Sequence, residues 1–362
     1  MRVRSRSIAI TAIASVALLM SACGGTDNSG TDTKTGTSEP GQTKAAEPGK
    51  AGGEITIRGC TPENPLIGPN TTEVCGGTII DAFTAKLVHY DADTAKPELD
   101  IAEAIETEDN TTFTVKLKKG YKFQDGTDVK AKNFVDAWNF AAYGPNGYAG
   151  SYFFEPIEGY ADVQCPDAEC KEKPKAETMT GLAVVDDNTF TIKTTSAVSN
   201  LPMRLGYSAF IPQPDSFFEA KDKAEWAKMP IGAGPFKVTS FNDQGAVLEK
   251  FADYSGKYVP KIEKVTFKVY NDTNAAFNDV VANNLDLTDT IPADQLVGDA
   301  YKAQLPDRNG TRETGIIQVN TFSPVDEQLK DIRMRQAISM AVDKKLITQQ
   351  VFNGAQTPAT SW

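Results

Sequence analysis

The sequence predicts a fold of mixed α and β structure, because segments of two different periodicities alternate along it. Short runs in which apolar and polar residues alternate indicate half-buried strands, and apolar residues spaced three and four apart indicate amphipathic helices. Both patterns recur between residues 53 and 342. The order of the segments follows neither a continuous βαβ repeat nor a solenoid period.

One strand and one helix are predicted first. The alternating segment GEITIRG, residues 53–59, is the strand, and residues 78–90 are the helix. The helix would bury a face made of Ile79, Ile80, Phe83, Leu87 and Val88. His89, the only histidine in the chain, would then lie at the helix end as a surface or packing residue.

Two similar hairpins are predicted in the middle of the chain, with a helix between them. Residues 111–120 alternate strictly after the turn signal EDN, and residues 184–194 repeat this pattern. We expect both hairpins to belong to a mixed sheet. Residues 131–143 have the spacing of an amphipathic helix. Its apolar face would contain Phe134, Ala137, Trp138 and Ala141.

The remaining segments predict further strands and then helices. Strands are expected after GAGP, over residues 245–251 and over residues 261–270, and the first two should pair. Residues 274–289 indicate a helix, a turn at Asn283–Asn284 and a short strand. Residues 331–342 again have a helical apolar spacing. The expected N-caps of this helix and the next are Asp331 and Asp343.

The N-terminal 53 residues predict export and anchoring. A basic start, an apolar or small run over Ile8–Met20 and a small-residue exit are typical of a secretory signal peptide, here residues 1–22. The run has thirteen residues, whereas a bilayer-spanning helix needs about 20. MSAC resembles the lipobox of bacterial lipoproteins, in which the cysteine, here Cys23, receives a diacylglycerol and becomes the N-terminus. Residues 23–53 would be this lipidated cysteine and a disordered tether, since no large apolar residue follows Cys23 up to Gly53.

The charge of the chain excludes some classes of partner. Removing the signal peptide removes three arginines and changes the formal net charge from −11 to −14. Such an acidic protein lacks the basic surface that neutralises the phosphates of nucleic acid, and it lacks a polybasic membrane-binding surface.

Four cysteines remain in the exported part, and their even number in an oxidising compartment favours disulfides. Three pairings are possible. We favour the local pairs Cys60–Cys75 and Cys165–Cys170, because each closes a polar loop that contains proline. A zinc site is the alternative, and the cysteine spacing and the single histidine disfavour it.

No enzyme signature was found in the sequence. It contains no G-x-S-x-G elbow, Walker loop, H-E-x-x-H motif or kinase signature. The segment GAG, residues 232–234, precedes a proline and a strand pattern, so it predicts a tight turn instead of a phosphate-binding loop. We therefore expect no catalytic residue, no metal site and no cofactor.

Aromatic residues in a Gly- and Pro-containing loop are the best candidates for ligand contacts. The segment GPNGYAGSYFFEPIEGY, residues 144–160, contains Tyr148, Tyr152 and Phe153, and residues 205–213 form a second such segment. A flexible backbone that carries aromatic side chains suits a ligand-contacting loop. The alternative for each of these residues is that its ring fills the core.

Several motifs together resemble the solute-binding lipoproteins of ABC importers, in the oligopeptide, dipeptide and nickel-binding class called family 5, of actinobacterial type. VKLKKGYKFQDGTDVKAKNFVDAWNF resembles the family signature of a strand, the motif KG-x-KF-x-DGT and a helix. Lys130 stands where the family usually has a Thr or Ser helix cap. GAGPFKVTSF, NNLDLTD and DIRMRQAISMAVDKKLI resemble three further family segments.

The resemblance implies a two-lobed periplasmic-binding-protein-like fold that closes on a ligand between its lobes. Residues 54–268 would form a nearly complete first lobe with an inserted subdomain at about 76–180, and residues 269–362 a partial second lobe. Family members usually continue further, so the chain would be a fragment or the product of a truncated gene.

The resemblance also implies an extracytoplasmic monomer, anchored to the outer face of the cell membrane through Cys23. It would bind an oligopeptide and deliver it to an ABC permease driven by ATPase subunits. The expected ligand contacts are Tyr148, Tyr152 and Phe153 in the first lobe, Tyr270 and Asn271 at the lobe crossover, and Asn64 after the first strand. Two alternatives stay open: the same fold binding an oligosaccharide or other solute, and a secreted enzyme or surface adhesion module.

Overall fold

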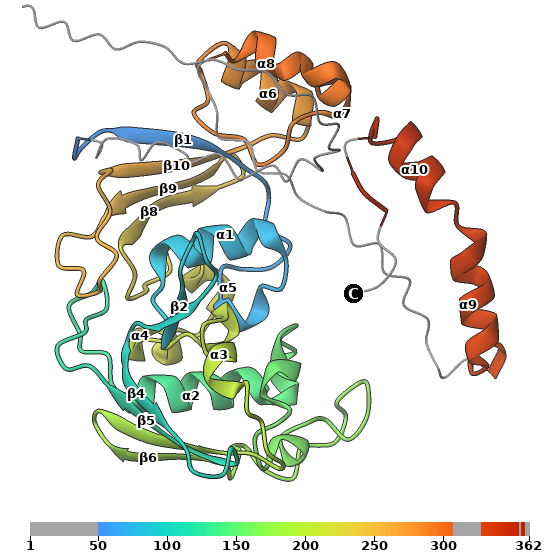
Figure 1. The fold of residues 1–362 in the computed structure, drawn as a ribbon. Coiled ribbons are helices and arrows are strands. Elements are labelled where there is room, and N and C mark those ends of the chain that lie inside the picture. The colour runs from blue at the N-terminus through green and yellow to red at the C-terminus, as the bar shows by residue number, and fades with distance from the viewer. Residues whose placement is uncertain (1–49, 307–326, 355, 359–362) are drawn as a thin grey trace, which may run out of the picture. The chain divides into compact units, whose positions relative to one another are not determined.

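The computed structural model of the chain describes residues 50–306, 327–354 and 356–358 (Figure 1). All of them belong to one compact unit, Gly49–Trp362. The predicted signal peptide, Cys23 and almost all of the tether lie outside the described residues. Within the described ranges, no helix is long and apolar enough to cross a membrane.

Strands and helices alternate along the described chain, which confirms the predicted mixed α and β structure. The strands are β1 (Glu54–Gly59), β2 (Val88–Tyr90), β3 (Pro97–Leu99), β4 (Ala102–Glu106), β5 (Thr112–Leu117), β6 (Leu182–Asp186), β7 (Thr189–Lys193), β8 (Phe236–Asn242), β9 (Gly245–Lys250) and β10 (Lys264–Val269). The α-helices are α1 (Val74–Phe83), α2 (Ala131–Ala142), α3 (Leu201–Arg204), α4 (Asp215–Glu219), α5 (Lys223–Trp226), α6 (Thr273–Val281), α7 (Ala293–Leu296), α8 (Ala300–Gln304), α9 (Ile332–Ala341) and α10 (Lys344–Gln350).

A mixed four-stranded sheet has the order β1-β10-β9-β8. β1 pairs in parallel with β10, from Glu54 opposite Lys264 to Gly59 opposite Val269, and the other pairs are antiparallel. α1 lies against this sheet (Figure 1) and buries Ile80 and Phe83 among its apolar side chains. Burial of each such side chain stabilises the fold by about 1.5–3 kcal/mol. Because β1 and β10 are parallel, their carboxyl ends lie at the same edge of the sheet.

The two predicted hairpins share a second four-stranded sheet, of order β4-β5-β7-β6. All three strand pairs are antiparallel, so the expectation of a mixed sheet was wrong for this pair of hairpins. α2 packs on it, and Phe134, Trp138 and Phe190 form the centre of the largest apolar core. The backbone N–H of Lys130, the N-cap of α2, donates to Asn133 Oδ1 at 2.9 Å, while Lys130 Nζ pairs with Asp187.

The first helix is shorter than predicted, and His89 lies in strand β2 instead of at a helix end. α1 ends at Phe83, whose carbonyl oxygen accepts hydrogen bonds from Gly234 N at 2.9 Å and from Gln124 Nε2 at 2.9 Å. These partners are distant in sequence and replace the bonds that a longer helix would make. The apolar periodicity continues past Phe83 because Leu87 and Val88 are buried in the core of the second sheet.

The predicted turn at Asn283–Asn284 is present, and Asn283 adopts a left-handed conformation with φ of 63°. The short strand expected after it is reduced to a single bridge between Leu287 and Ile57. α9 and α10 begin at the predicted caps: Asp331 accepts from Arg333 N at 2.9 Å and Asp343 accepts from Leu346 N at 2.8 Å. The predicted disulfide pairs, Cys60–Cys75 and Cys165–Cys170, are both formed in the structure.

Candidate functional site

A pocket of about 580 Å³ opens at the carboxyl edge of the mixed sheet. Its walls come from residues 60–65 after β1, Ala227 and Lys228 after α5, residues 241–244 at the end of β8 and in the turn to β9, and Val269 at the end of β10. The volume lies within the range of roughly 300–1,000 Å³ that is usual for small-ligand sites. Because the carboxyl ends of parallel strands are a common place for ligands in α/β proteins, this edge is a candidate site.

Local contacts hold the loop that leads from β1 along this pocket to α1. The Cys60–Cys75 disulfide joins the two ends of the loop. Within it, the Thr71 hydroxyl donates to Ile67 O at 3.2 Å, and Glu73 caps α1 by accepting from Gly76 N at 2.9 Å. Asn64, one of the predicted ligand contacts, lies half-buried in the pocket wall.

The loop that carries the predicted aromatic contacts is attached to the same segment. Gly150 N donates to Pro69 O at 2.9 Å, and Ala149 N donates to Asn70 Oδ1 at 3.2 Å. A Cβ atom at Gly150 would lie 2.4 Å from Pro69 O, so only glycine allows this approach. The aromatic loop therefore has a fixed position beside the loop that lines the pocket.

Tyr152, Phe153 and Tyr207 form a stack that we call the aromatic ladder. The ring centroids of Tyr152 and Phe153 are 4.5 Å apart at 27°, and those of Phe153 and Tyr207 are 4.5 Å apart at 28°. Tyr152 is 56% exposed and Tyr207 is 36% exposed. The ladder thus presents ring surface to solvent and joins two segments that are distant in sequence.

Tyr148 has a different environment from its neighbours in the loop. Its ring packs in an apolar cluster with Ile67, Phe217 and Ala227, of which Ala227 also lines the pocket. The Tyr148 hydroxyl is buried without a hydrogen-bond partner among the residues described, and burial raises its pKa. In this structure Tyr148 supports the pocket wall from behind, and its contact with a ligand stays a prediction.

Tyr270 and Asn271 follow β10, and the structure gives Tyr270 a local partner. The Tyr270 hydroxyl donates to Asp279 Oδ2 at 2.5 Å, and Lys268 Nζ lies 4.8 Å from the centre of the Tyr270 ring. These contacts fix α6 against the end of β10. Asn271 is exposed, and neither residue lines the pocket, so their role as ligand contacts is untested.

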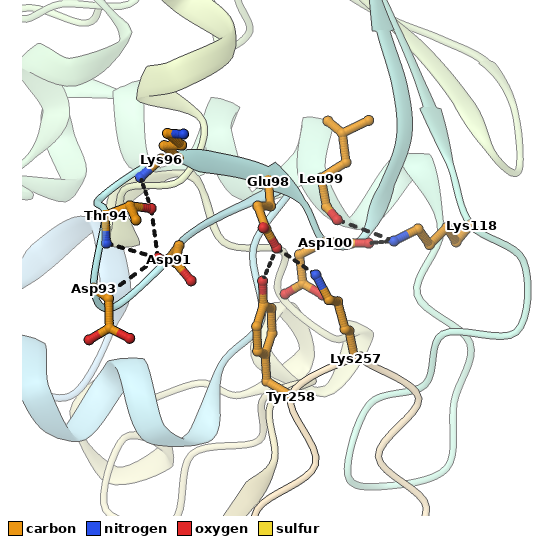
Figure 2. A network of polar contacts seen from close by, with 10 residues as sticks. All are labelled: Asp91, Asp93, Thr94, Lys96, Glu98, Leu99, Asp100, Lys118, Lys257 and Tyr258. Carbon is orange, nitrogen blue, oxygen red and sulfur yellow. Dashed lines mark hydrogen bonds and ion pairs between the residues drawn. The ribbon is translucent and has the colours of Figure 1, made fainter. Parts of the chain in front are cut away.

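A polar network surrounds the hairpin of β2 and β3 (Figure 2). Glu98 on β3 accepts hydrogen bonds from Lys257 Nζ at 2.6 Å and from the Tyr258 hydroxyl at 2.5 Å. His89, opposite Glu98 on β2, stacks on Tyr258 with ring centroids 3.8 Å apart. The network attaches the hairpin to the segment after β9, which is a structural role, and it makes His89 a packing residue.

Asp100 is buried directly after this hairpin. The Tyr121 hydroxyl donates to Asp100 Oδ1 at 2.9 Å. Lys118 Nζ donates to the Asp100 carbonyl oxygen at 2.5 Å (Figure 2). Burial raises the pKa of the Asp100 carboxyl above its ordinary value. In the part of the chain that the structure describes, no group of three or more His, Cys, Asp or Glu side chains is placed to bind a metal ion.

Residues 96–362 match the bacterial extracellular solute-binding proteins, family 5. The chain belongs to this family. The oligopeptide-binding protein OppA of Bacillus subtilis (strain 168) is 26% identical over 352 residues, which cover 94% of this chain and 60% of OppA.

Solved structures show the same fold. The murein tripeptide binding protein MppA of Escherichia coli matches with a TM-score of 0.69 and 23% identity, over 84% of this chain and 58% of MppA. The oligopeptide-binding protein AppA of Bacillus subtilis, solved in complex with a nonapeptide, matches with a TM-score of 0.62 and 23% identity, over 84% of this chain and 56% of AppA. The chain thus spans about 60% or less of the length of these relatives, and the expected periplasmic-binding-protein-like fold is confirmed.

Gln124 joins two motifs of this family 5 chain, KFQDGT and the GAG segment. The sequence did not indicate this role. Gln124 lies in the KFQDGT motif, and its side chain donates to Phe236 O at 2.6 Å and accepts from Gly232 N at 2.9 Å. A Cβ atom at Gly232 would lie 2.1 Å from Phe83 O. The GAG segment is therefore a close approach to the end of α1, which the sequence did not predict, and the strand predicted after it is β8.

Tyr207 was not among the predicted contacts, although its segment was noted as a second aromatic loop. The structure brings it onto Phe153 through η5 (Ser208–Phe210), which contacts η1 (Gly68–Asn70). A Cβ atom at Gly68 would lie 2.3 Å from Ser208 O. One signal in the sequence could have indicated Tyr207 as a contact: both loops contain glycine close to aromatic residues, as in Gly206–Tyr207.

Proposed function

We propose that this protein is the extracytoplasmic substrate-binding component of an ABC importer, that it binds oligopeptides, and that it delivers them to a membrane permease driven by ATPase subunits. Membership of family 5 is the observation that carries this proposal. Relatives named as oligopeptide-binding or dipeptide-binding proteins, and a solved relative in complex with a nonapeptide, support a peptide as the ligand.

The pocket and the aromatic loop would form the first-lobe side of the binding site. Asn64 and Gln244 line the pocket with side-chain amides that can donate to and accept from a peptide backbone. Ordered waters would complete the hydrogen bonds of varied ligand side chains. Tyr152 and Phe153 would contact the ligand from the adjacent loop, whereas Tyr270 and Asn271 would act at the crossover to the second lobe.

The lobe boundaries are part of the proposal. Residues 54–268 would form the first lobe, with an inserted subdomain at about 76–180, and residues 269–362 would begin the second. The two four-stranded sheets with their separate cores support a first lobe of two parts. A ligand held between lobes gains affinity from closure, because closure removes more of its surface from water.

Anchoring through a diacylglycerol on Cys23 is proposed from the lipobox-like MSAC sequence alone. Labelling growing cells with radioactive palmitate should label the protein, and Cys23→Ser should abolish the label and release the protein from the membrane. Retention of the unlabelled Cys23→Ser protein by the membrane would contradict the anchor.

Thermal-shift titration of the full chain, purified in detergent, tests the ligand class. Peptide pools, oligosaccharides and divalent metal ions are compared at equal concentrations, and we expect only the peptides to raise the melting temperature, by mass action. Oligosaccharides are a real second candidate, because the exposed rings of the aromatic ladder could stack on sugars. A shift with oligosaccharides and none with peptides would replace the peptide proposal. Size-exclusion chromatography with light scattering tests the proposed monomer.

A further inference from the structure

We propose that the aromatic ladder makes this protein selective for peptides with an aromatic side chain, which stacks on the exposed ring surface of Tyr152 and Tyr207. The inference rests on the proposed function of peptide binding, and it adds a preference that family membership does not supply. Its basis is the geometry of the three rings and of the groups around them.

The ladder is held in place from inside the protein. Phe153, its middle ring, packs edge-to-face on the buried Phe210, with centroids 6.2 Å apart. Phe210 in turn packs edge-to-face on Trp138 at 5.3 Å and on Phe154 at 5.3 Å, both fully buried. Because the core orients the ladder before a ligand arrives, little side-chain freedom remains to be lost on binding.

The backbone at both ends of the ladder is equally constrained. A Cβ atom at Gly206 would lie 2.6 Å from the ring of Tyr90, in the same way that Gly150 approaches Pro69. The Tyr90 hydroxyl donates to Met203 O at 2.6 Å and so attaches β2 to the segment before Tyr207. The relative position of the two aromatic segments is therefore fixed by close contacts that larger residues would prevent.

Exposed apolar surface continues beyond the ladder. Met203 is 48% exposed and Tyr90 is 37% exposed, and the Tyr90 ring lies against Gly206, the residue before Tyr207. Grouped exposed rings on an otherwise acidic protein mark an interaction surface. An aromatic side chain should bind this surface more tightly than an aliphatic one, because stacked aromatic pairs are stabilised beyond the contribution of their buried area.

The exposed ring faces of the ladder oppose one class of side chain, because the face of an aromatic ring is negative. Asp81 lines a small pocket with Tyr90 and Gly206 beside the ladder, and its carboxylate is paired there with Lys86 Nζ at 2.5 Å. This pairing leaves no free cation at Lys86 to attract an acidic ligand side chain. A peptide with glutamate at the stacking position should therefore bind most weakly.

Isothermal titration calorimetry on the full chain in detergent tests the preference. The probes are pentapeptides of sequence Ala-Ala-X-Ala-Ala, with X as Phe, Leu or Glu. Leu buries a similar apolar area without a flat ring, so the ratio of the Phe and Leu dissociation constants isolates stacking. We expect Phe to bind roughly 3- to 10-fold more tightly than Leu, from the usual strength of aromatic pairs, and Glu to bind most weakly.

Variants locate the preference on the ladder. Tyr152→Leu and Tyr207→Leu should reduce the Phe-to-Leu ratio towards one, because the Phe peptide loses more affinity than the Leu peptide, whereas Tyr152→Phe should retain the ratio. Tyr258→Leu is the matched control, because it removes a tyrosine that stacks on His89 instead, and it should retain the ratio too.

The two proposals fail in different ways. If no pentapeptide binds, the proposed function fails and the selectivity with it. If all the peptides bind and the wild-type protein treats Phe and Leu alike, selectivity is overturned and peptide binding stands. The same conclusion follows if Tyr152→Leu and Tyr207→Leu both keep the wild-type ratio.

Discussion

Gln124 lies where the end of α1 meets the GAG segment, and its side chain contacts both. Gln124→Ala would remove side-chain bonds to Phe83 O, Phe236 O and Gly232 N. The buried N–H of Gly232 would lose its side-chain acceptor, whereas Phe83 O would keep its bond from Gly234 N. We expect the free energy of unfolding to fall by roughly 2–3 kcal/mol, measured by urea denaturation. Gln164→Ala, which removes one half-buried bond to Ala142 O, should cost about 1 kcal/mol or less. Equal losses in the two variants would contradict the proposed role of Gln124.

Tyr148 carries a hydroxyl that is buried without a partner among the described residues. Tyr148→Phe removes this desolvated group and keeps the ring in its cluster. The variant should therefore be more stable than the wild type by about 1 kcal/mol, measured by denaturant titration. A peptide titration on the same variant decides the predicted ligand contact, since weaker binding would show that the hydroxyl meets the ligand.

Asp100 should make stability depend on pH in an unusual direction. Its folded-state pKa is raised by burial, so between the unfolded value of about 3.9 and the folded value only the folded state keeps the proton. Its contribution to stability therefore falls as pH rises through this window. Asp100→Asn removes the charge and keeps an acceptor for Tyr121. The variant should gain stability over the wild type as pH rises above 4, measured by thermal melts across pH.

Asp109 provides a control of opposite sign. Hydrogen bonds from the Thr111 hydroxyl and from backbone N–H groups of Thr112 and Thr111 lower its pKa to about 2. Its contribution is present above the unfolded value and is lost as pH falls towards 2. Asp109→Asn should therefore be less stable than the wild type at neutral pH, and the difference should shrink in acid. The same pH trend in both variants would contradict the opposite pKa shifts.

Among the elements, the loop between β1 and α1 depends on its disulfide. Cys60 and Cys75 are 15 residues apart, and Cys165 and Cys170 are 5 apart. In the chain-entropy model, replacing the first pair by alanines should cost about 3 kcal/mol and replacing the second about 2 kcal/mol. Denaturant unfolding of the two double variants measures this. Loss of the first pair should also weaken peptide binding, because Asn64 lies in the released loop.

Periodicity predicted the elements well wherever local contacts decide them. The β1 strand, the two hairpins, α2 and the caps Asp331 and Asp343 all follow from patterns within about twelve residues. The extent of α1 was not predictable in this way. Its end is set by Gly234 and Gln124, which are distant in sequence, while apolar residues continue past Phe83 because they serve another core.

At the scale of the whole molecule, the same distinction applies to the candidate site. The sequence identified the aromatic loop and Asn64, but not that Tyr207 stacks on Phe153, because this contact joins segments about fifty residues apart. Nor did it indicate that Tyr148 packs inward while its neighbour Tyr152 is exposed. The composition of both loops predicted aromatic ligand contacts. Only the tertiary structure separates the aromatic residues that support the pocket wall from those that face solvent.

The outer rings of the aromatic ladder and the core rings beneath it are under different constraints. Replacing Phe210 or Trp138 would disturb the core. Tyr152 and Tyr207 are exposed, and they stack on Phe153, which packs on Phe210. Evolution could therefore replace the outer rings and alter what the protein accepts while its folding is unaffected. Among related proteins that bind different peptides, we expect the residues at positions 152 and 207 to vary and those at positions 138 and 210 to stay the same.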